Sequence, residues 1–136
     1  MTTKIMSIIL LLSMGFTACK KESTPQPKTT QEKLSGKWNF VSTISNHFYS
    51  GSSHIITTTG AAGDYVDFRN DGKLYSYIIG SYDTIAYGIV NESKIWIDNT
   101  TYTFDLKVFT DTDLQMYHKE IPNATDYDET TVTLKK

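Results

Sequence analysis

From residue 32 onward, apolar and polar residues alternate along the chain with a period of two. The run 102–108 shows this most clearly, with apolar side chains at Tyr102, Phe104, Leu106 and Val108. Such alternation is typical of a β-strand with one face on a core and the other in water. No stretch after residue 35 has helical periodicity, and 31–35 offers at most one short turn. The pattern therefore restricts this part of the chain to an all-β fold.

Turn signals divide the alternating runs into eight or nine expected strands. Asn70-Asp71-Gly72, for example, favours the left-handed conformations that a tight hairpin needs. The expected strands are about 36–45, 53–59, 64–69, 72–79, 83–90, 93–98, 101–109, 112–119 and 129–135. Hairpins between successive strands predict an antiparallel up-and-down meander. We expect the meander to close into a barrel, because closure removes exposed strand edges.

Two segments interrupt the regular spacing. Residues 45–63 are rich in Ser, Thr and Gly, and we expect them to cross one end of the barrel as a mobile gate. Residues 121–128 include Pro122 and predict a longer loop.

The N-terminus has the features of a secretory signal. Lys4 supplies positive charge, and Ile5–Phe16 is an apolar run too short to span a bilayer. Phe16-Thr17-Ala18-Cys19 follows, and this resembles the lipobox of bacterial lipoproteins. The resemblance implies cleavage between Ala18 and Cys19 and attachment of acyl chains such as palmitate to Cys19. The alternative is a buried free cysteine in a core helix.

A polar tether follows the lipobox. Residues 20–31 contain no apolar side chain, and Pro25 and Pro27 oppose regular structure. Lys20 follows Cys19 directly, with no Asp in its place, so we expect sorting to the outer membrane of a Gram-negative bacterium. The periplasmic and surface faces both remain open. The expected organisation is a signal peptide over 1–18, a lipidated tether over 19–31 and a barrel domain over 32–136.

The first expected strand opens on Leu34-Ser35-Gly36-Lys37-Trp38. This segment resembles the Gly-x-Trp motif of lipocalins, and the hairpins that follow it are similar to small lipocalin-like domains of bacterial lipoproteins. The resemblance implies that Gly36 turns the chain into the barrel and that Trp38 plugs its closed end. Family members stack an arginine near the C-terminus on this Trp, whereas this chain ends in Lys135-Lys136.

The charged and titratable residues point to no catalytic or metal chemistry. The formal net charge is -2 at pH 7 and Arg69 is the only arginine, so the chain has no basic field for nucleic acid. His47, His54 and His118 lack metal-ligand spacing, and we expect them in surface or turn positions. Asp67–Gly72 lacks the ligand pattern of a calcium loop, because Arg69 occupies a ligand position. We therefore expect that the protein is not an enzyme and that it binds neither a cofactor nor a metal ion.

Aromatic side chains are the remaining functional clue. Those expected on central strands and proposed as ligand-binding are Tyr75, Tyr77, Tyr87 and Trp96. They suit an apolar pocket with polar tips, although packing of the barrel explains them as well. The sequence thus predicts a membrane-anchored barrel that binds a small hydrophobic ligand. The alternative is a structural or interaction subunit of a cell-envelope complex, with a protein partner in place of the ligand.

Overall fold

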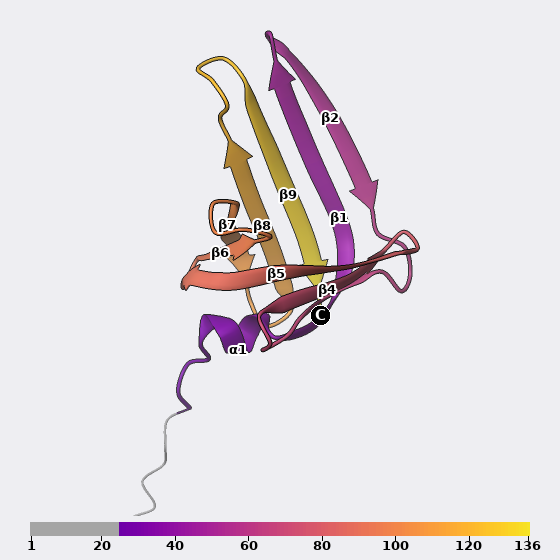
Figure 1. Cartoon of the computed structure of the whole chain (residues 1–136). Helices are drawn as coiled ribbons and strands as arrows, with labels where there is room; N and C mark the ends of the chain where they lie inside the picture. The colour runs from indigo at the N-terminus through magenta and orange to yellow at the C-terminus, as the bar shows by residue number, and fades with distance from the viewer. Residues whose placement is uncertain (1–24) are drawn as a thin grey trace, which may run out of the picture.

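A computed structural model describes residues 25–136 of the chain, so the expected signal peptide and Cys19 lie outside the described residues. One short helix, α1 (Thr30–Leu34), precedes nine strands. The strands are β1 (Gly36–Tyr49), β2 (Ser52–Thr59), β3 (Tyr65–Phe68), β4 (Lys73–Ile78), β5 (Ser81–Asn91), β6 (Lys94–Ile97), β7 (Thr103–Phe109), β8 (Asp113–Glu120) and β9 (Tyr127–Lys135). The predicted all-β, antiparallel meander closing into a barrel is confirmed (Figure 1).

Strand β1 closes the barrel because it has three partners. Its first residues, Gly36–Asn39, pair with β3, and its later residues, Ser42–Tyr49, pair with β2 along the same edge. The opposite edge pairs with β9, with a bulge between Phe40 and Ser42. Eight strands therefore form the closed ring, and β2 lies outside it as a ninth strand bonded only to β1.

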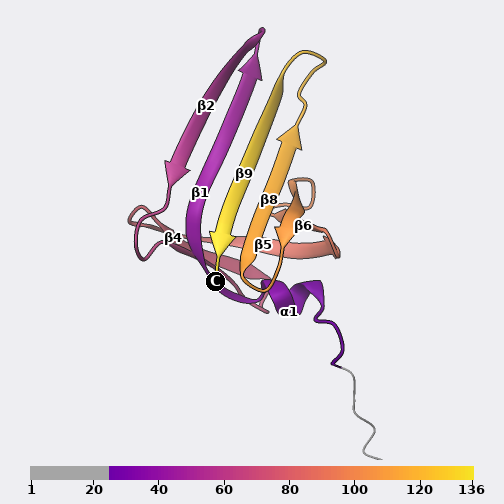
Figure 2. The same cartoon turned by 180° about the vertical axis from the view of Figure 1, so that it is seen from behind.

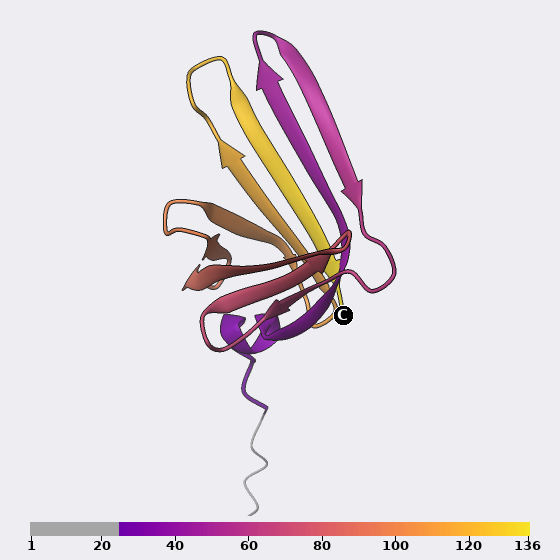
Figure 3. The same cartoon turned by 45° about the vertical axis from the view of Figure 1, so that its right-hand side comes forward.

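The strands of the ring have unequal lengths, which makes the two ends of the barrel different. Strands β2, β1, β9 and β8 form a tall sheet that extends well beyond the short strands at the base (Figures 2 and 3). We call the end with the tips of the β1–β2 and β8–β9 hairpins the open end, and the opposite end the closed end. The segment 45–63 was expected to cross one end as a gate. Most of it is instead the regular β1–β2 hairpin, because 45–48 pair on both edges.

The closed end is filled by the protein's own side chains. Residues with at most 1% of their surface exposed are Leu34, Trp38, Phe68, Ile95, Leu114 and Leu134. The Trp38 indole Nε1–H donates a hydrogen bond of 2.7 Å to the Leu34 carbonyl, which couples α1 to the core. Gly36 has a φ of +102°, a conformation that L side chains rarely adopt, so the turn from α1 into β1 favours glycine.

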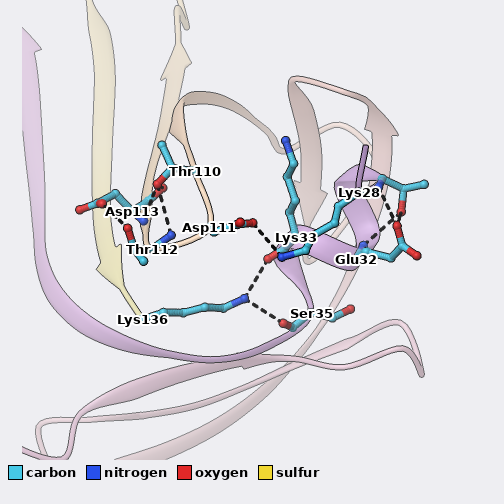
Figure 4. Close-up of polar contacts among 10 residues, drawn as sticks. Lys28, Glu32, Lys33, Ser35, Thr110, Asp111, Thr112, Asp113 and Lys136 are labelled. Carbon is cyan, nitrogen blue, oxygen red and sulfur yellow. Dashed lines mark hydrogen bonds and ion pairs between the residues drawn. The ribbon is translucent and has the colours of Figure 1, made fainter. Parts of the chain in front are cut away.

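Helix α1 lies across the closed end and connects it to the tether. A capping box between Thr29 and Glu32 fixes its first turn. The Lys136 ammonium donates hydrogen bonds of 2.9 and 3.2 Å to the carbonyls of Lys33 and Ser35 (Figure 4). Lys28, just before the helix, forms an exposed 3.1 Å ion pair with Asp111 in the β7–β8 turn. The tether therefore leaves from the closed end, opposite the open tips.

Candidate functional site

The four aromatic residues proposed from the sequence do not line one cavity. On β4 the buried residues are Leu74 and Ser76, so Tyr75 and Tyr77 lie on the outer face of the barrel. On β6 the buried residue is Ile95, which places Trp96 outside as well. Only Tyr87 points into the barrel. Tyr75 and Trp96 therefore share no site with Tyr87.

Tyr87 is a packing residue of the core. Its ring meets Phe68 edge to face, with centroids 5.2 Å apart. Its hydroxyl donates to the Arg69 carbonyl at 2.8 Å and accepts from the Gln31 side-chain amide at 2.9 Å. Burial raises the pKa of this phenol. Tyr87 thus ties α1 to the barrel and has no free polar tip for a ligand.

The outward aromatics cover the strand surface. Tyr65, Tyr77 and Tyr82 lie directly opposite one another on β3, β4 and β5 and form one row of rings that are tilted against one another. Trp96 lies flat over Gly88 of the neighbouring strand, where a built Cβ would be 2.5 Å from the indole Nε1. Gly88 is therefore the residue that makes room for Trp96, and the indole protects the backbone of β5.

A different set of side chains meets at the open end. The strand register places Glu120, Asp128, His47 and His54 opposite one another across β8, β9, β1 and β2. The next row inward is His118, Thr130, Ser45 and Ile56. Both rows lie on the inner side, because they share strand parity with buried Leu114, Met116 and Leu134. We call these two rows, with Tyr49 and Tyr102, the open-end face.

Asp128 is the centre of a hydrogen-bond network on this face. The Tyr49 hydroxyl donates to its Oδ2 at 2.5 Å, and the Nδ1 of His47 lies 2.6 Å from its Oδ1. These two contacts hold the pKa of Asp128 below its usual range, and the same carboxylate raises the pKa of Tyr49. The backbone N–H of Ser50 also donates to Asp126 at 3.1 Å. The network holds the tips of the two hairpins together.

His118 is the most deeply buried titratable residue of the open-end face. It is 8% exposed, and its Nδ1 lies 2.7 Å from the Thr103 carbonyl. A carbonyl only accepts hydrogen bonds, so Nδ1 carries a proton, and in the neutral form of the ring Nε2 has a free lone pair. Among the side-chain polar atoms of residues 25–136, this Nε2 is the one that is buried without a partner. Leaving such an atom unpaired costs about 1–3 kcal/mol, so its persistence requires a reason.

The Tyr102 ring packs against the His118 ring. The two ring centroids are 3.9 Å apart, and Tyr102 also meets Phe104 edge to face at 5.3 Å. Burial raises the pKa of Tyr102, and the nearby charges of Glu120 and Asp128 raise it further. Tyr102 therefore joins the apolar core to the acidic part of the open-end face.

A hollow of about 530 Å³ lies beside this pair of rings. Its lining residues are Asn99, Thr101, Tyr102, Thr103, His118, Lys119, Glu120 and Ile121. This volume is within the range of about 300–1,000 Å³ that small-molecule sites occupy. A second hollow of about 520 Å³ lies at the closed end, where Pro27, Lys28 and Lys33 line it together with Phe109. It lies on the path of the tether, whereas the first hollow includes Tyr102, His118 and Glu120 of the open-end face.

Register explains why sequence patterns missed this site. His118 on β8 lies far along the chain from His47 and His54 of the β1–β2 hairpin, and only strand pairing brings the three onto one face. His118 is buried, contrary to the expected surface position. No group of three or more His, Cys, Asp or Glu side chains within 25–136 is arranged to hold a metal ion.

No helix within the described part of the chain is long and apolar enough to cross a membrane. No protein-family model matches this sequence, and no curated protein matches it significantly. The chemistry of the open-end face therefore has to carry the functional interpretation by itself.

Proposed function

We propose that this chain is a bacterial lipoprotein, anchored through Cys19 in the outer membrane, whose lipocalin-like barrel binds a small hydrophobic ligand at its open end. The observation that carries the proposal is the contrast between the two ends. The barrel interior at the closed end is packed around Trp38, and the hollow at that end lies on the path of the tether. The open end has a hollow next to a buried, unpartnered histidine nitrogen.

The anchor gives the two ends different roles. Because the tether leaves from the closed end, a lipid on Cys19 would place that end toward the membrane. The open-end face would then point away from the bilayer, toward ligands in the aqueous compartment. A Cys19→Ser variant should move from the membrane fraction to the soluble fraction. Unchanged membrane association of this variant would contradict the anchor.

The ligand version is tested by two neighbouring substitutions on β9. Thr130 lies on the inner side opposite His118, and Thr131 lies on the outer side opposite Tyr117. The full-length lipoprotein is purified from its own membranes, and bound small molecules are identified by native mass spectrometry. Thr130→Phe fills the open end and should abolish co-purifying mass, whereas Thr131→Phe should retain it. Equal ligand content in both variants would contradict a site at the open end.

A second function is favoured by the free edge of β2. Within residues 25–136 this strand pairs only with β1, and its sequence, Ser-Ser-His-Ile-Ile-Thr-Thr-Thr, lacks the Lys, Pro and acidic residues that usually protect edges. Ile55 is 63% exposed on it. Such an edge suits strand addition by a protein of the cell envelope. A photo-crosslinking residue at Thr57 should then capture a partner in intact cells, and one at Thr84 on β5 should not.

A further inference from the structure

Positively charged side chains of the strands lie on the outer face of the barrel, and the charged side chains of the inner side are acidic. Lysines on the strands lie on the outer face, where Lys94 and Lys107 pair with Asp105, Lys119 with Glu129 and Lys135 with Asp113. The inner side of the strands has no lysine or arginine, as the alternation with the buried residues shows for β1–β9. Its charged residues are acidic: Asp83, Glu120 and Asp128. The inner side therefore presents a negative field to anything that enters the open end.

Glu120 is the acid of this set that lies beside the hollow. It lines the hollow together with Tyr102 and His118, and within the described residues it has no ion-pair partner. Lys119 also lines the hollow, but its ammonium is paired on the outer face, where it lies 2.8 Å from Glu129 and 4.1 Å from the Tyr127 ring centroid. The carboxylate of Glu120 is thus available to a cation from outside.

His118 also lines the hollow, and its Nε2 atom has no hydrogen-bond partner within residues 25–136. Its Nδ1–H donates to the Thr103 carbonyl, so in the neutral form of the ring Nε2 accepts a hydrogen bond and does not donate one. The atom is buried and unpartnered. A carboxylate ligand offers only acceptors and would be repelled by Glu120, whereas an ammonium offers three donors and a positive charge.

Apolar surface lies next to these two acceptors. The Tyr102 ring and the exposed side chain of Ile121 line the hollow. Ile97 and Val132, which pack on the core, provide further apolar surface near the base of the open end. An aromatic face also attracts an ammonium, which adds to the same preference.

We propose that the open-end face selects a small amphiphile with a primary ammonium group, held by Glu120 and His118, with its hydrocarbon part against Tyr102 and Ile121. This inference rests on the proposed binding function and names the chemical class of the ligand. It distinguishes the site from one for fatty acids, whose carboxylate has the wrong charge and the wrong hydrogen-bonding groups.

The test compares four probes of equal chain length against the full-length mature protein in nanodiscs of zwitterionic phosphatidylcholine. The probes are hexylammonium, trimethylhexylammonium, 1-hexanol and hexanoate. Binding is followed by NMR shifts of the Tyr102 and His118 rings, with empty nanodiscs as the blank for partitioning into lipid. Hexylammonium should bind about tenfold more tightly than hexanol, and hexanoate should not bind measurably. Trimethylhexylammonium cannot donate an N–H and should lie between the two.

Matched variants assign the selectivity to the site. Glu120→Gln on the inner face should lower the affinity for hexylammonium about tenfold, and Glu129→Gln on the outer face of the next strand should leave it unchanged. Hexanol binding as tightly as hexylammonium would overturn the ammonium inference but retain an apolar site. Failure of all four probes to shift any open-end resonance would overturn the proposed binding function too.

Discussion

The Lys136 ammonium lies 4.4 Å from the centroid of the Trp38 ring and simultaneously donates to two carbonyls at the end of α1. The C-terminal residue thus closes the barrel from below and joins the last strand, the first strand and the helix. Burial lowers the pKa of this ammonium, and the charge of Lys28 lowers it further. Among the described residues, the cation over the Trp38 ring is therefore this lysine.

Lys136→Met should remove this contact and keep the length of the side chain. We expect a loss of about 1 kcal/mol in the free energy of unfolding, measured by urea titration with tryptophan fluorescence. Lys135→Met removes an exposed lysine with a 3.5 Å ion pair and should cost no more than about 0.5 kcal/mol. Lys136→Arg should restore most of the stability. Equal effects of the two methionine variants would contradict the role of Lys136.

Gly88→Ala tests the packing of Trp96 on the outer face. The added methyl would meet the indole at 2.5 Å, and we expect a cost of about 1–3 kcal/mol in urea unfolding. In a Trp96→Ala background the same substitution should cost much less, because the clash is gone. A double-mutant cycle without coupling would show that Trp96 does not occupy the surface over Gly88.

Tyr87→Phe separates the structural from the ligand-binding interpretation of the tyrosines. Removing the hydroxyl breaks its hydrogen bonds to Arg69 and Gln31, so unfolding should become easier by about 1–2 kcal/mol. Tyr77→Phe makes the same chemical change on the outer face, where no hydrogen bond to its hydroxyl is found within 25–136, and should lie within about 0.5 kcal/mol of the parent. Tyr87→Phe should leave hexylammonium affinity unchanged. A large loss of hexylammonium affinity in Tyr87→Phe would show that Tyr87 contributes to the ligand site.

The Asp128 network predicts a defined pH dependence. Hydrogen bonds from Tyr49 and His47 lower the folded-state pKa of Asp128 below its value of about 3.9 in an unfolded chain. The network therefore stabilises the fold above that pH, and this stabilisation is lost as the pH falls through the folded-state pKa. Carboxyl NMR titration should show the depressed pKa, and Tyr49→Phe should raise it toward the ordinary value. An unchanged titration in Tyr49→Phe would contradict the network.

The strands were predictable because their signals are local. Alternation and turn residues lie within a few positions of each other, and all nine strands appear close to their expected places. Which face of β4 and β6 points inward was not predictable from the sequence. Both faces of these strands present large nonpolar side chains: Leu74 and Tyr75 on β4, and Ile95 and Trp96 on β6. The open-end face depends on register between strands far apart in sequence. The same applies to Lys136, whose partner Trp38 is at the other end of the chain.

The extension of β1 was missed for a related reason. Ser45, Asn46 and His47 are polar and look like a loop, yet each pairs with β2 on one edge and β9 on the other. The inward side chains of Ser45 and His47 then supply polar groups to the open-end face. A polar segment that continues an alternating strand can therefore be part of that strand, as residues 45–48 are here.

The most direct test of a ligand site at the open end is photo-crosslinking with a six-carbon primary ammonium probe that carries a diazirine. The full-length protein in nanodiscs is irradiated with the probe, and the modified residues are identified by peptide mass spectrometry. Adducts are predicted on Tyr102, Glu120 or Ile121, and they should disappear in Thr130→Phe but persist in Thr131→Phe. Adducts confined to the outer tyrosines Tyr75 and Tyr82, or unaffected by Thr130→Phe, would contradict binding at the open end.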